Sequence, residues 1–269
     1  MDLEDRCAIV TGGGHGIGRA LAEALAGRGA RVVVADLHTA RAEKIAARIG
    51  GLAVSCDVAD PAAVAALVDR AESAFGPVEV LCSNAGIGDV GDGIASSVEQ
   101  VRRVVDINLL AHVWGAEAVL PGMVSRGRGW IVATISSASL ITGPSGMSYT
   151  LTKHGALGFA EWVALNYAHL GIGVTCLCPN AVNTGMLGRD EDREDGAPQP
   201  ADPDLVARLG DVVEPERCAE LTLEAMEQGR FLVLPHPRVG ESFLRKAQDY
   251  DAWLARTNLR LRRMRGESL

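Results

Sequence analysis

Cysteine is scarce in this sequence and is never spaced as in a metal site. Four of the cysteines fall inside or beside apolar runs that we predict to be strands. Cys176 and Cys178 are two residues apart, but no second Cys or His pair at ligand spacing accompanies them. We therefore expect no metal, and free buried thiols at Cys7, Cys56, Cys82, Cys176, Cys178 and Cys218.

Positive charge is also in deficit. The chain has 26 Lys and Arg against 34 Asp and Glu, a net charge of -8, so its average field repels a polyanion and we expect no nucleic-acid partner. The N-terminus, MDLEDRCAIVTGG, carries acids where a signal peptide carries basic residues. No apolar run reaches the roughly 18 residues that span a bilayer. We therefore expect a cytoplasmic protein without a membrane partner.

What the sequence does contain is an alternation of short apolar runs and longer helical patterns. Its 269 residues, 48% of them apolar, suffice for one α/β domain with a large core. Parallel strands need crossovers, so the alternation predicts a doubly wound parallel β-sheet, Rossmann-like, with helices on both faces in a single domain over 1–269. The predicted strands are CAIVTG, RVVVAD, LAVSCDV, VEVLCSNAG, WIVATIS, GVTCLCP and RFLVLPH, and the predicted helices are 16–28, 39–49, 61–75, 97–126 and 149–170.

Two segments depart from this alternation. Residues 188–211 are rich in acids, Pro and Gly with little periodicity, and we predict a mobile loop that covers the substrate site. Residues 241–265 are predicted to form a helical extension, because apolar residues recur there at spacings of four and three. Such a stripe can lie on a membrane surface, but packing over the sheet or against a partner subunit is commoner.

A glycine-rich turn, TGGGHGIG, follows the first predicted strand and opens the first helix. Glycine allows close backbone approach, and the free amides and positive dipole end of a helix suit a pyrophosphate. A P-loop needs Lys and then Ser or Thr where Arg19 and Ala20 stand, so ATP hydrolysis is not indicated. A tight turn without a ligand is the alternative. The cofactor-binding residues expected here are Gly12, Gly14, His15, Gly16, Ile17 and Gly18.

Asp36 ends the second predicted strand, about 20 residues after the glycine turn. A carboxylate at this point accepts hydrogen bonds from an adenosine ribose and repels a 2′-phosphate. The neighbouring Leu37 supplies no compensating cation, so we expect NAD rather than NADP. The alternative is that Asp36 only caps or turns the chain before the next helix.

Tyr149 and Lys153 stand four residues apart in SYTLTKHG, about one helical turn, so their side chains can share a site. Taken alone, such a pair is usually an exposed helix ridge. Together with the glycine turn, however, these residues make the sequence resemble the short-chain dehydrogenases/reductases, on TGxxxGIG and YxxxK motifs. The match runs from Arg6 to about Pro235.

The resemblance implies which residues form the site. The expected catalytic residues are Asn108, Ser136, Tyr149 and Lys153. Ser136 stands 13 residues before Tyr149, as in the family, while Ser137 and Ser139 remain alternatives. Further expected cofactor contacts, besides Tyr149 and Lys153, are Asp57, Val58, Asn84, Ala85, Gly86, Pro179, Val182 and Thr184. Two departures stand out, because Ser83 replaces a frequent Asn and Asn180 replaces the usual Gly.

The implied activity is an NAD(H)-dependent transfer of a hydride between nicotinamide and a secondary alcohol or ketone. Tyr149 would be the general acid/base, and we expect Lys153 to lower its pKa from the ordinary value of about 10 while also binding the nicotinamide ribose. Ser136 would hold the substrate oxygen, and Asn108 would hold a water that relays the proton. The scheme requires no metal.

Two other functions compete with this one: a nucleotide-sugar epimerase or dehydratase, which usually has a longer C-terminal domain, and a non-catalytic NAD-sensing regulatory protein. An apolar substrate is indicated by the residues expected near the pocket, Leu140, Ile141, Met147, Met186 and Leu187. The resemblance also implies a homotetramer formed through helices 97–126 and 149–170. Small residues on the second helix would allow close approach: Ala156, Gly158, Ala160 and Ala164.

Overall fold

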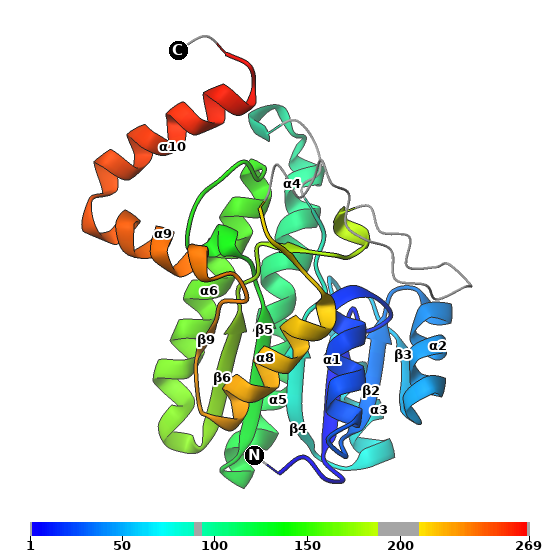
Figure 1. Ribbon diagram of the computed structural model, residues 1–269. Helices are drawn as coiled ribbons and strands as arrows, with labels where there is room; N and C mark the ends of the chain where they lie inside the picture. The colour runs from blue at the N-terminus through cyan, green and yellow to red at the C-terminus, as the bar shows by residue number, and fades with distance from the viewer. Residues whose placement is uncertain (1, 89–92, 188–209, 268–269) are drawn as a thin grey trace.

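The computed structural model describes residues 2–88, 93–187 and 210–267 (Figure 1). Its centre is a seven-stranded parallel sheet in the order β3-β2-β1-β4-β5-β6-β9, so the predicted doubly wound sheet is confirmed. The strands are β1 (Cys7–Thr11), β2 (Arg31–Asp36), β3 (Leu52–Ser55), β4 (Val78–Ser83), β5 (Gly129–Thr134), β6 (Ile172–Leu177) and β9 (Leu232–Val233).

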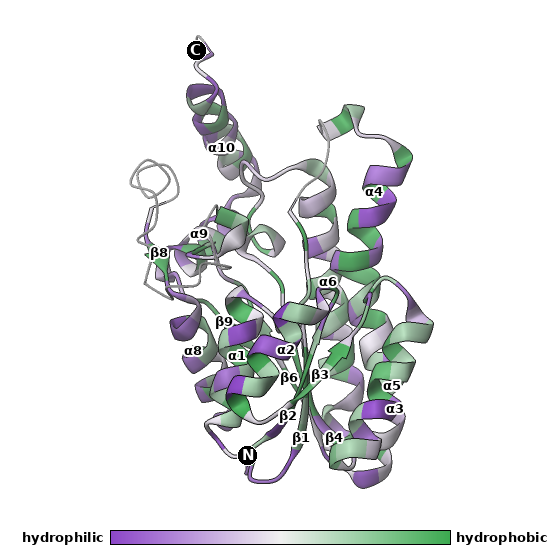
Figure 2. Ribbon diagram, turned by 90° about the vertical axis from the view of Figure 1, so that its right-hand side faces the viewer, coloured by the Kyte–Doolittle hydropathy of each residue, from purple (hydrophilic) through white to green (hydrophobic). Residues whose placement is uncertain are grey.

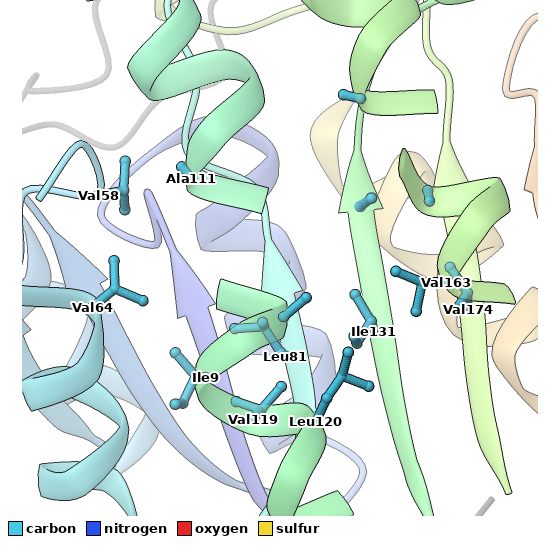
Figure 3. Close-up of a cluster of buried hydrophobic side chains, with 14 of the residues drawn as sticks. Ile9, Val58, Val64, Leu81, Ala111, Val119, Leu120, Ile131, Val163 and Val174 are labelled. Atoms are coloured by element: carbon cyan, nitrogen blue, oxygen red, sulfur yellow. The ribbon is translucent and has the colours of Figure 1, made fainter. Parts of the chain in front are cut away.

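Helices cover both faces of this sheet. One layer consists of α1 (Gly16–Ala26), α2 (Thr39–Ile49) and α8 (Pro215–Glu227), and the other consists of α3 (Pro61–Phe75), α4 (Val98–Val105), α5 (Ala111–Arg126) and α6 (Met147–Tyr167). Alternate residues of a strand point to opposite faces. In β1, accordingly, Ile9 packs in the α3–α5–α6 layer (Figure 3), whereas Ala8 and Val10 pack with α1 and α2. All six cysteines are buried free thiols, as predicted.

The strand order reverses between β1 and β4. The crossovers on the two sides of this point carry the chain in opposite directions along the sheet, which leaves a crevice beyond the carboxyl ends of β1 and β4. Ligands of open α/β sheets bind in that crevice. The glycine turn after β1 and the chain after β4 therefore lie where a dinucleotide would bind.

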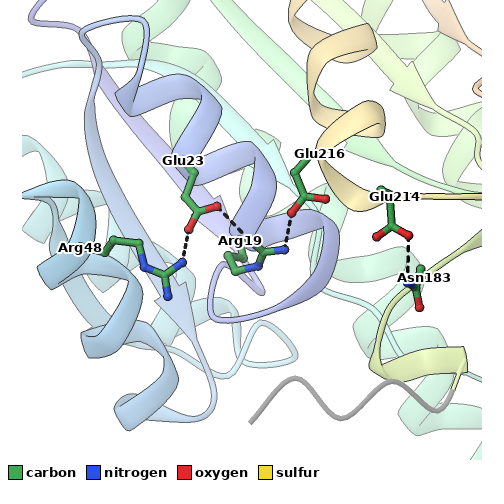
Figure 4. A network of polar contacts seen from close by, with 6 residues as sticks. All are labelled: Arg19, Glu23, Arg48, Asn183, Glu214 and Glu216. Carbon is green, nitrogen blue, oxygen red and sulfur yellow. Dashed lines mark hydrogen bonds and ion pairs between the residues drawn. The ribbon is translucent and has the colours of Figure 1, made fainter. Parts of the chain in front are cut away.

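Charged residues tie α1 to its neighbouring helices (Figure 4). Arg19 contacts Glu216 of α8 at 2.6 Å and Glu23 at 2.9 Å, and Glu23 in turn contacts Arg48 of α2 at 2.6 Å. Such partly exposed pairs contribute little stability individually. They nevertheless fix how α1, whose N-terminus opens the crevice, sits against α2 and α8.

The helix predicted over 97–126 is interrupted by one wide turn. A π-helix, Asp106–Leu110, separates α4 from α5 and contains Asn108. The whole run, Val98–Arg126, is long and apolar enough to cross a membrane by length and composition, so our expectation that no run reaches that length was wrong. Half of its apolar window is buried inside the protein, and a single helix of this kind is weak evidence for a membrane span.

A second, two-stranded sheet was not predicted. It pairs β7 (Ala181–Val182) with β8 (Val212–Val213), so residues on either side of the segment 188–211 are held together. Of the loop predicted there, only Gly210 and Asp211 belong to the described residues. The rest of that prediction lies outside them.

The C-terminal extension consists of two helices rather than one continuous helix. They are α9 (Pro237–Gln248) and α10 (Tyr250–Met264), with α10 reaching away from the sheet (Figures 1 and 2). The chain breaks at Asp249, which is extended (φ -152°, ψ 92°) and whose carboxylate accepts a hydrogen bond from the Ala252 amide at 2.9 Å. An N-cap of this kind starts a new helix, which the apolar spacing alone did not reveal.

Candidate active site

The glycine turn between β1 and α1 has room for nothing larger than glycine at its closest points. Gly12 has a positive φ of 62°, and a Cβ on Gly18 would lie 2.0 Å from the Gly12 carbonyl oxygen. The first turn of α1 carries no acidic residue, and His15 provides no side-chain cap. The amides at this helix start are thus suited to an anionic phosphate, and the residues fit a dinucleotide.

Asn84 has a structural use in this crevice. Its Nδ2 donates to the Thr11 carbonyl at 2.9 Å, while the Thr11 hydroxyl oxygen accepts from the amides of Asn84 at 3.0 Å and Ala85 at 3.2 Å. These bonds join the turn after β1 to the chain after β4. The side chain expected to contact the cofactor is therefore engaged in holding the crevice together.

Asp36 lies at the end of β2 with its side chain buried beside the glycine turn. Its carboxylate accepts from the amides of Gly14 at 3.0 Å and His38 at 2.9 Å. Burial raises its pKa, but the bonds from His15, His38 and Gly14 outweigh that effect, so the pKa is lowered overall and the group stays ionised. The oxygen that accepts from His38, Oδ1, retains capacity for a second hydrogen bond. The N-cap of α2 is His38 and not Asp36.

Asp57 and Val58, both expected to contact the cofactor, have different surroundings in the structure. Val58 is buried in the α3–α5 core (Figure 3), so its side chain is unavailable to a ligand. Asp57 accepts from the Ala59 amide at 3.0 Å and contacts Arg103 at 3.5 Å. A residue that the sequence analysis missed is Arg41 of α2, whose Cβ would lie 2.7 Å from a Cβ on Gly14.

Asn108 is fully buried on the π-helix and pins the chain after β4. Its Oδ1 accepts from the Ile87 amide at 2.8 Å and its Nδ2 donates to the Ile87 carbonyl at 2.9 Å. A Cβ on Gly86 would lie 3.3 Å from Asn108 Oδ1 and 3.5 Å from Lys153 Nζ. The structure thus brings Asn108, Gly86 and Lys153 together, with both polar atoms of Asn108 bonded to the backbone.

Ser136 and Tyr149 meet at the carboxyl end of β5. The Ser136 side chain hydrogen-bonds Tyr149 and also accepts from the Ala138 amide at 3.1 Å. The two alternative serines point elsewhere: the Ser137 hydroxyl donates to Asn180 at 3.2 Å, and the Ser139 hydroxyl donates to the Ser136 carbonyl at 2.6 Å. Of the three serines, Ser136 is the one with a bond to the tyrosine.

Lys153 lies one turn along α6 from Tyr149, as the spacing predicted. Its side chain is buried, and Nζ donates to the Thr134 carbonyl at 3.3 Å. Nζ also sits 5.5 Å from the centre of the Tyr149 ring, so the ammonium lies over the face of the ring. Lys153 is therefore buried and Tyr149 is half-buried at the cavity, so the pair is not an exposed helix ridge.

The stretch PNAVNT, 179–184, borders the same site and depends on a residue that the sequence analysis missed. His236 is buried and accepts from the Asn180 amide at 3.1 Å through Nδ1, while its Nε2 lies 3.0 Å from the Ala181 carbonyl. This brace holds the turn in which Asn180 replaces glycine. Nearby, the Pro179 carbonyl accepts from the Ser137 amide at 2.7 Å, Val182 is buried, and the Thr184 hydroxyl donates to the Val182 carbonyl at 3.3 Å.

A cavity of about 820 Å³ opens from Ser136 and Tyr149. Ile141, Met186 and Leu187 line it, as expected, whereas Leu140 is buried outside the lining and Met147 does not border it. The opposite wall comes from α9 and α10. The cavity is large enough for a substrate well beyond a small alcohol.

Comparison with known proteins agrees with this geometry. The short chain dehydrogenase family profile matches residues 6–195. This chain belongs to the short-chain dehydrogenase family. It is 38% identical over 199 residues to 2,5-dichloro-2,5-cyclohexadiene-1,4-diol dehydrogenase of Sphingobium indicum, covering 72% of this chain and 80% of that one. It is 34% identical over 225 residues to cyclohexanol dehydrogenase of Acinetobacter sp., covering 81% and 86%.

Solved structures show the same relationship. A short-chain dehydrogenase/reductase from Burkholderia phymatum in complex with NAD superposes with a TM-score of 0.82 at 28% identity, over 94% of this chain and 96% of that one. The family and the fold together make the protein an oxidoreductase. The resemblance recognised in the sequence is confirmed.

The protonation energetics of this short-chain dehydrogenase differ from our expectation. Burial raises the pKa of Tyr149, the Ser136 hydrogen bond lowers it in part, and Cys178 raises it further. Lys153, whose Nζ lies 5.5 Å from the ring centre, does not bring the pKa of Tyr149 below its ordinary value. Burial also lowers the pKa of Lys153 to about 8, with Cys178 acting in the opposite direction. Both groups are thus shifted toward their neutral forms.

We predict that Lys153→Met stabilises the folded protein at pH 7. Below about pH 8, folding buries a charged ammonium at Lys153. Between about pH 8 and the ordinary pKa of 10.5, this lysine is mostly protonated in the unfolded chain and mostly neutral in the folded one. The free energy of unfolding of the wild type therefore rises with pH through that window. The variant should therefore unfold at higher urea, with a gain of about 1–3 kcal/mol at pH 7 that shrinks toward pH 10.

The control is Lys44→Met, which removes an exposed lysine from α2 and should leave the urea midpoint nearly unchanged at each pH. A Lys153→Met protein that is less stable than wild type at pH 7 would show that the buried ammonium is well compensated.

Proposed function

We propose that the protein is an NAD(H)-dependent oxidoreductase that transfers a hydride between nicotinamide and a secondary alcohol or ketone. The observation that carries the proposal is the cluster of Ser136, Tyr149 and Lys153 at a cavity wall, beside a turn that fits a dinucleotide. Relatives named for dehydrogenation of a ring diol and of cyclohexanol support the substrate class. No comparison supports a non-catalytic NAD sensor.

When bound, the nicotinamide supplies or accepts the hydride. The chain's own residues handle the proton at the substrate oxygen. Ser136 holds that oxygen through its hydroxyl, and Tyr149 gives its phenolic proton to it when a ketone is reduced or takes the alcohol proton in the reverse direction. Because burial raises the pKa of Tyr149, the phenol is protonated at neutral pH, which suits ketone reduction.

Lys153 and Asn108 have supporting roles in this scheme. The Lys153 ammonium donates hydrogen bonds to ribose hydroxyls and adds positive charge near Tyr149, which favours phenolate during alcohol oxidation. Asn108 holds the chain around Gly86 and Ile87 next to Lys153, and so positions the backbone beside that lysine.

Tyr149→Phe should abolish most turnover while leaving folding and NAD affinity nearly intact. The change removes one oxygen and keeps the ring, so a loss of about 10² to 10⁴ in turnover is expected for a missing general acid/base. Cyclohexanol and cyclohexanone, followed by nicotinamide absorbance, provide the first assay. Tyr167→Phe, which removes the same oxygen from the other end of α6, should retain activity. Near-normal turnover in Tyr149→Phe would refute the proposed mechanism.

We propose NAD over NADP as the cofactor, on the position of Asp36 beside Gly14. Solved structures of relatives in complex with NAD or NADH support a nicotinamide cofactor, and the choice between NAD and NADP rests on Asp36. Asp36→Ala should reduce the ratio of NAD affinity to NADP affinity at least tenfold in calorimetric titrations. The change removes the carboxylate that repels a 2′-phosphate and leaves Arg41 nearby to attract it. Glu43→Ala removes an exposed carboxylate from α2 and should preserve the preference. Tighter wild-type binding of NADP would contradict the role of Asp36.

We propose a homotetramer, with α6 as one contact surface. The sequence-based reason needs correction, since Ala156 and Ala160 face the core. The exposed stripe of α6 instead carries Leu151, Trp162 and Leu165, which are 56%, 52% and 82% exposed. Such apolar exposure on one helix face is typical of a protein contact.

Light scattering of the wild type should therefore give four times the chain mass, and Leu165→Glu should lower that mass. Leu244→Glu, at another exposed leucine on α9, is the matched control and should leave the assembly intact. A monomeric wild type at micromolar concentration would overturn the proposed assembly.

A further inference from the structure

The two C-terminal helices present arginines to the same cavity that contains Tyr149. One face of α9 and one face of α10 line it, at the three- and four-residue spacing of neighbours on a helix. From α9 they include Arg238, Glu241, Ser242 and Arg245, and from α10 they are Trp253, Thr257, Arg260 and Leu261. The part of the cavity lining that α9 and α10 supply is thus charged, although the sequence pointed to an apolar pocket.

The charge of this wall runs against that of the whole protein. The chain has a net charge of -8, yet residues 237–267 contain eight Lys and Arg and only four Asp and Glu. Within the wall, Arg245 is engaged, since it lies 3.8 Å from Glu241 and donates to Ser242 at 3.2 Å. Across the described ranges, Arg238 and Arg260 have no ion-pair partner. Two guanidinium groups therefore remain for a ligand in the cavity.

A buried lysine fixes this wall to the loop that carries Ser136. Lys246 of α9 donates from Nζ to the Leu140 carbonyl at 2.8 Å. The same Nζ sits 5.3 Å from the ring centre of Tyr250 and 5.1 Å from that of Trp253, so it also holds the start of α10. The two helices that carry the arginines are consequently attached, through Lys246, to the loop that follows Ser136.

We infer that the substrate carries an anionic group, a carboxylate or a phosphate, which Arg238 and Arg260 bind inside the cavity. Guanidinium groups donate paired hydrogen bonds to both kinds of oxyanion. Ile141, Met186 and Leu187 also line the cavity and suit an apolar part of the same substrate. The inference rests on the proposed function for the reacting end only. The substrate class is thus an amphiphilic hydroxy or keto acid, or its phosphate analogue.

Calorimetry with matched probes tests this without any need for turnover. The probes are 4-(4-hydroxycyclohexyl)butanoate, its methyl ester, and the analogue in which a phosphate monoester replaces the carboxylate, each titrated with NAD present and absent. One of the two anions should bind at least tenfold more tightly than the ester, a difference of about 1.4 kcal/mol. The tighter anion identifies the group, and the preference should fall with added NaCl because both arginines are exposed.

Variants assign the preference to the two arginines. Arg238→Gln with Arg260→Gln should reduce the anion-to-ester affinity ratio about tenfold, and the Lys double variant should keep most of it. Arg256→Gln with Arg263→Gln removes two charges from α10 outside the cavity lining and should leave the ratio unchanged. Unchanged thermal midpoints establish that each variant is folded.

Three results would overturn the inference: an ester that binds as tightly as both anions, a Gln double variant that keeps the ratio, or an equal loss in the off-cavity control. Failure of the proposed function looks different. In that case the anion binds with arginine dependence but no probe changes nicotinamide absorbance. Conversely, the enzyme would oxidise both the acid and the ester and bind them with equal affinity if only the anion site were wrong. That result would support the proposed oxidoreductase activity and refute the anion site.

Discussion

Thr11 and Asn84 join the ends of β1 and β4 by hydrogen bonds between side chains and backbone, and the rest of the site depends on this junction. It lies where the strand order reverses, so it determines both the width of the crevice and the path of the chain that follows each strand. The glycine turn on one side can approach so closely because Gly12 and Gly18 lack a Cβ. On the other side, the chain passes directly to Gly86 and then to Ile87, whose amide donates to Asn108.

Burial is the largest influence on the pKa values of the candidate catalytic residues Tyr149 and Lys153. Burial removes water from Tyr149 and Lys153 and shifts the pKa of each toward its neutral form. Burying such polar groups lowers the stability of the folded protein relative to apolar residues at the same positions. The surrounding bonds from Ser136 and to the Thr134 carbonyl compensate only partly. A pair of titratable groups kept in such surroundings is typical of a functional site.

The anion site that we infer lies in a part of the chain beyond the match to the family profile. The family profile ends at residue 195, whereas α9 and α10 occupy residues 237–264. The part of the chain that matches the profile contains the residues proposed to bind the cofactor and to transfer the proton. The C-terminal helices contribute a cavity wall whose positive charge is opposite in sign to the net charge of the chain. Lys246 connects the two parts, because its ammonium bridges the Leu140 carbonyl and the aromatic rings of α10.

The sequence by itself determined the features that depend on near neighbours: the alternating strands and helices, the glycine turn at the start of α1, and the one-turn spacing of Tyr149 and Lys153. Only the tertiary structure decided the features that need partners distant along the chain. Among these are the brace from His236 to Asn180, 56 residues apart, and the bond from Lys246 to Leu140, 106 residues apart. The raised pKa of Tyr149 and the arginine wall belong with them, because desolvation and the charge of a cavity depend on which segments fold together. Periodicity reports which face of a helix is apolar, but not what that face meets.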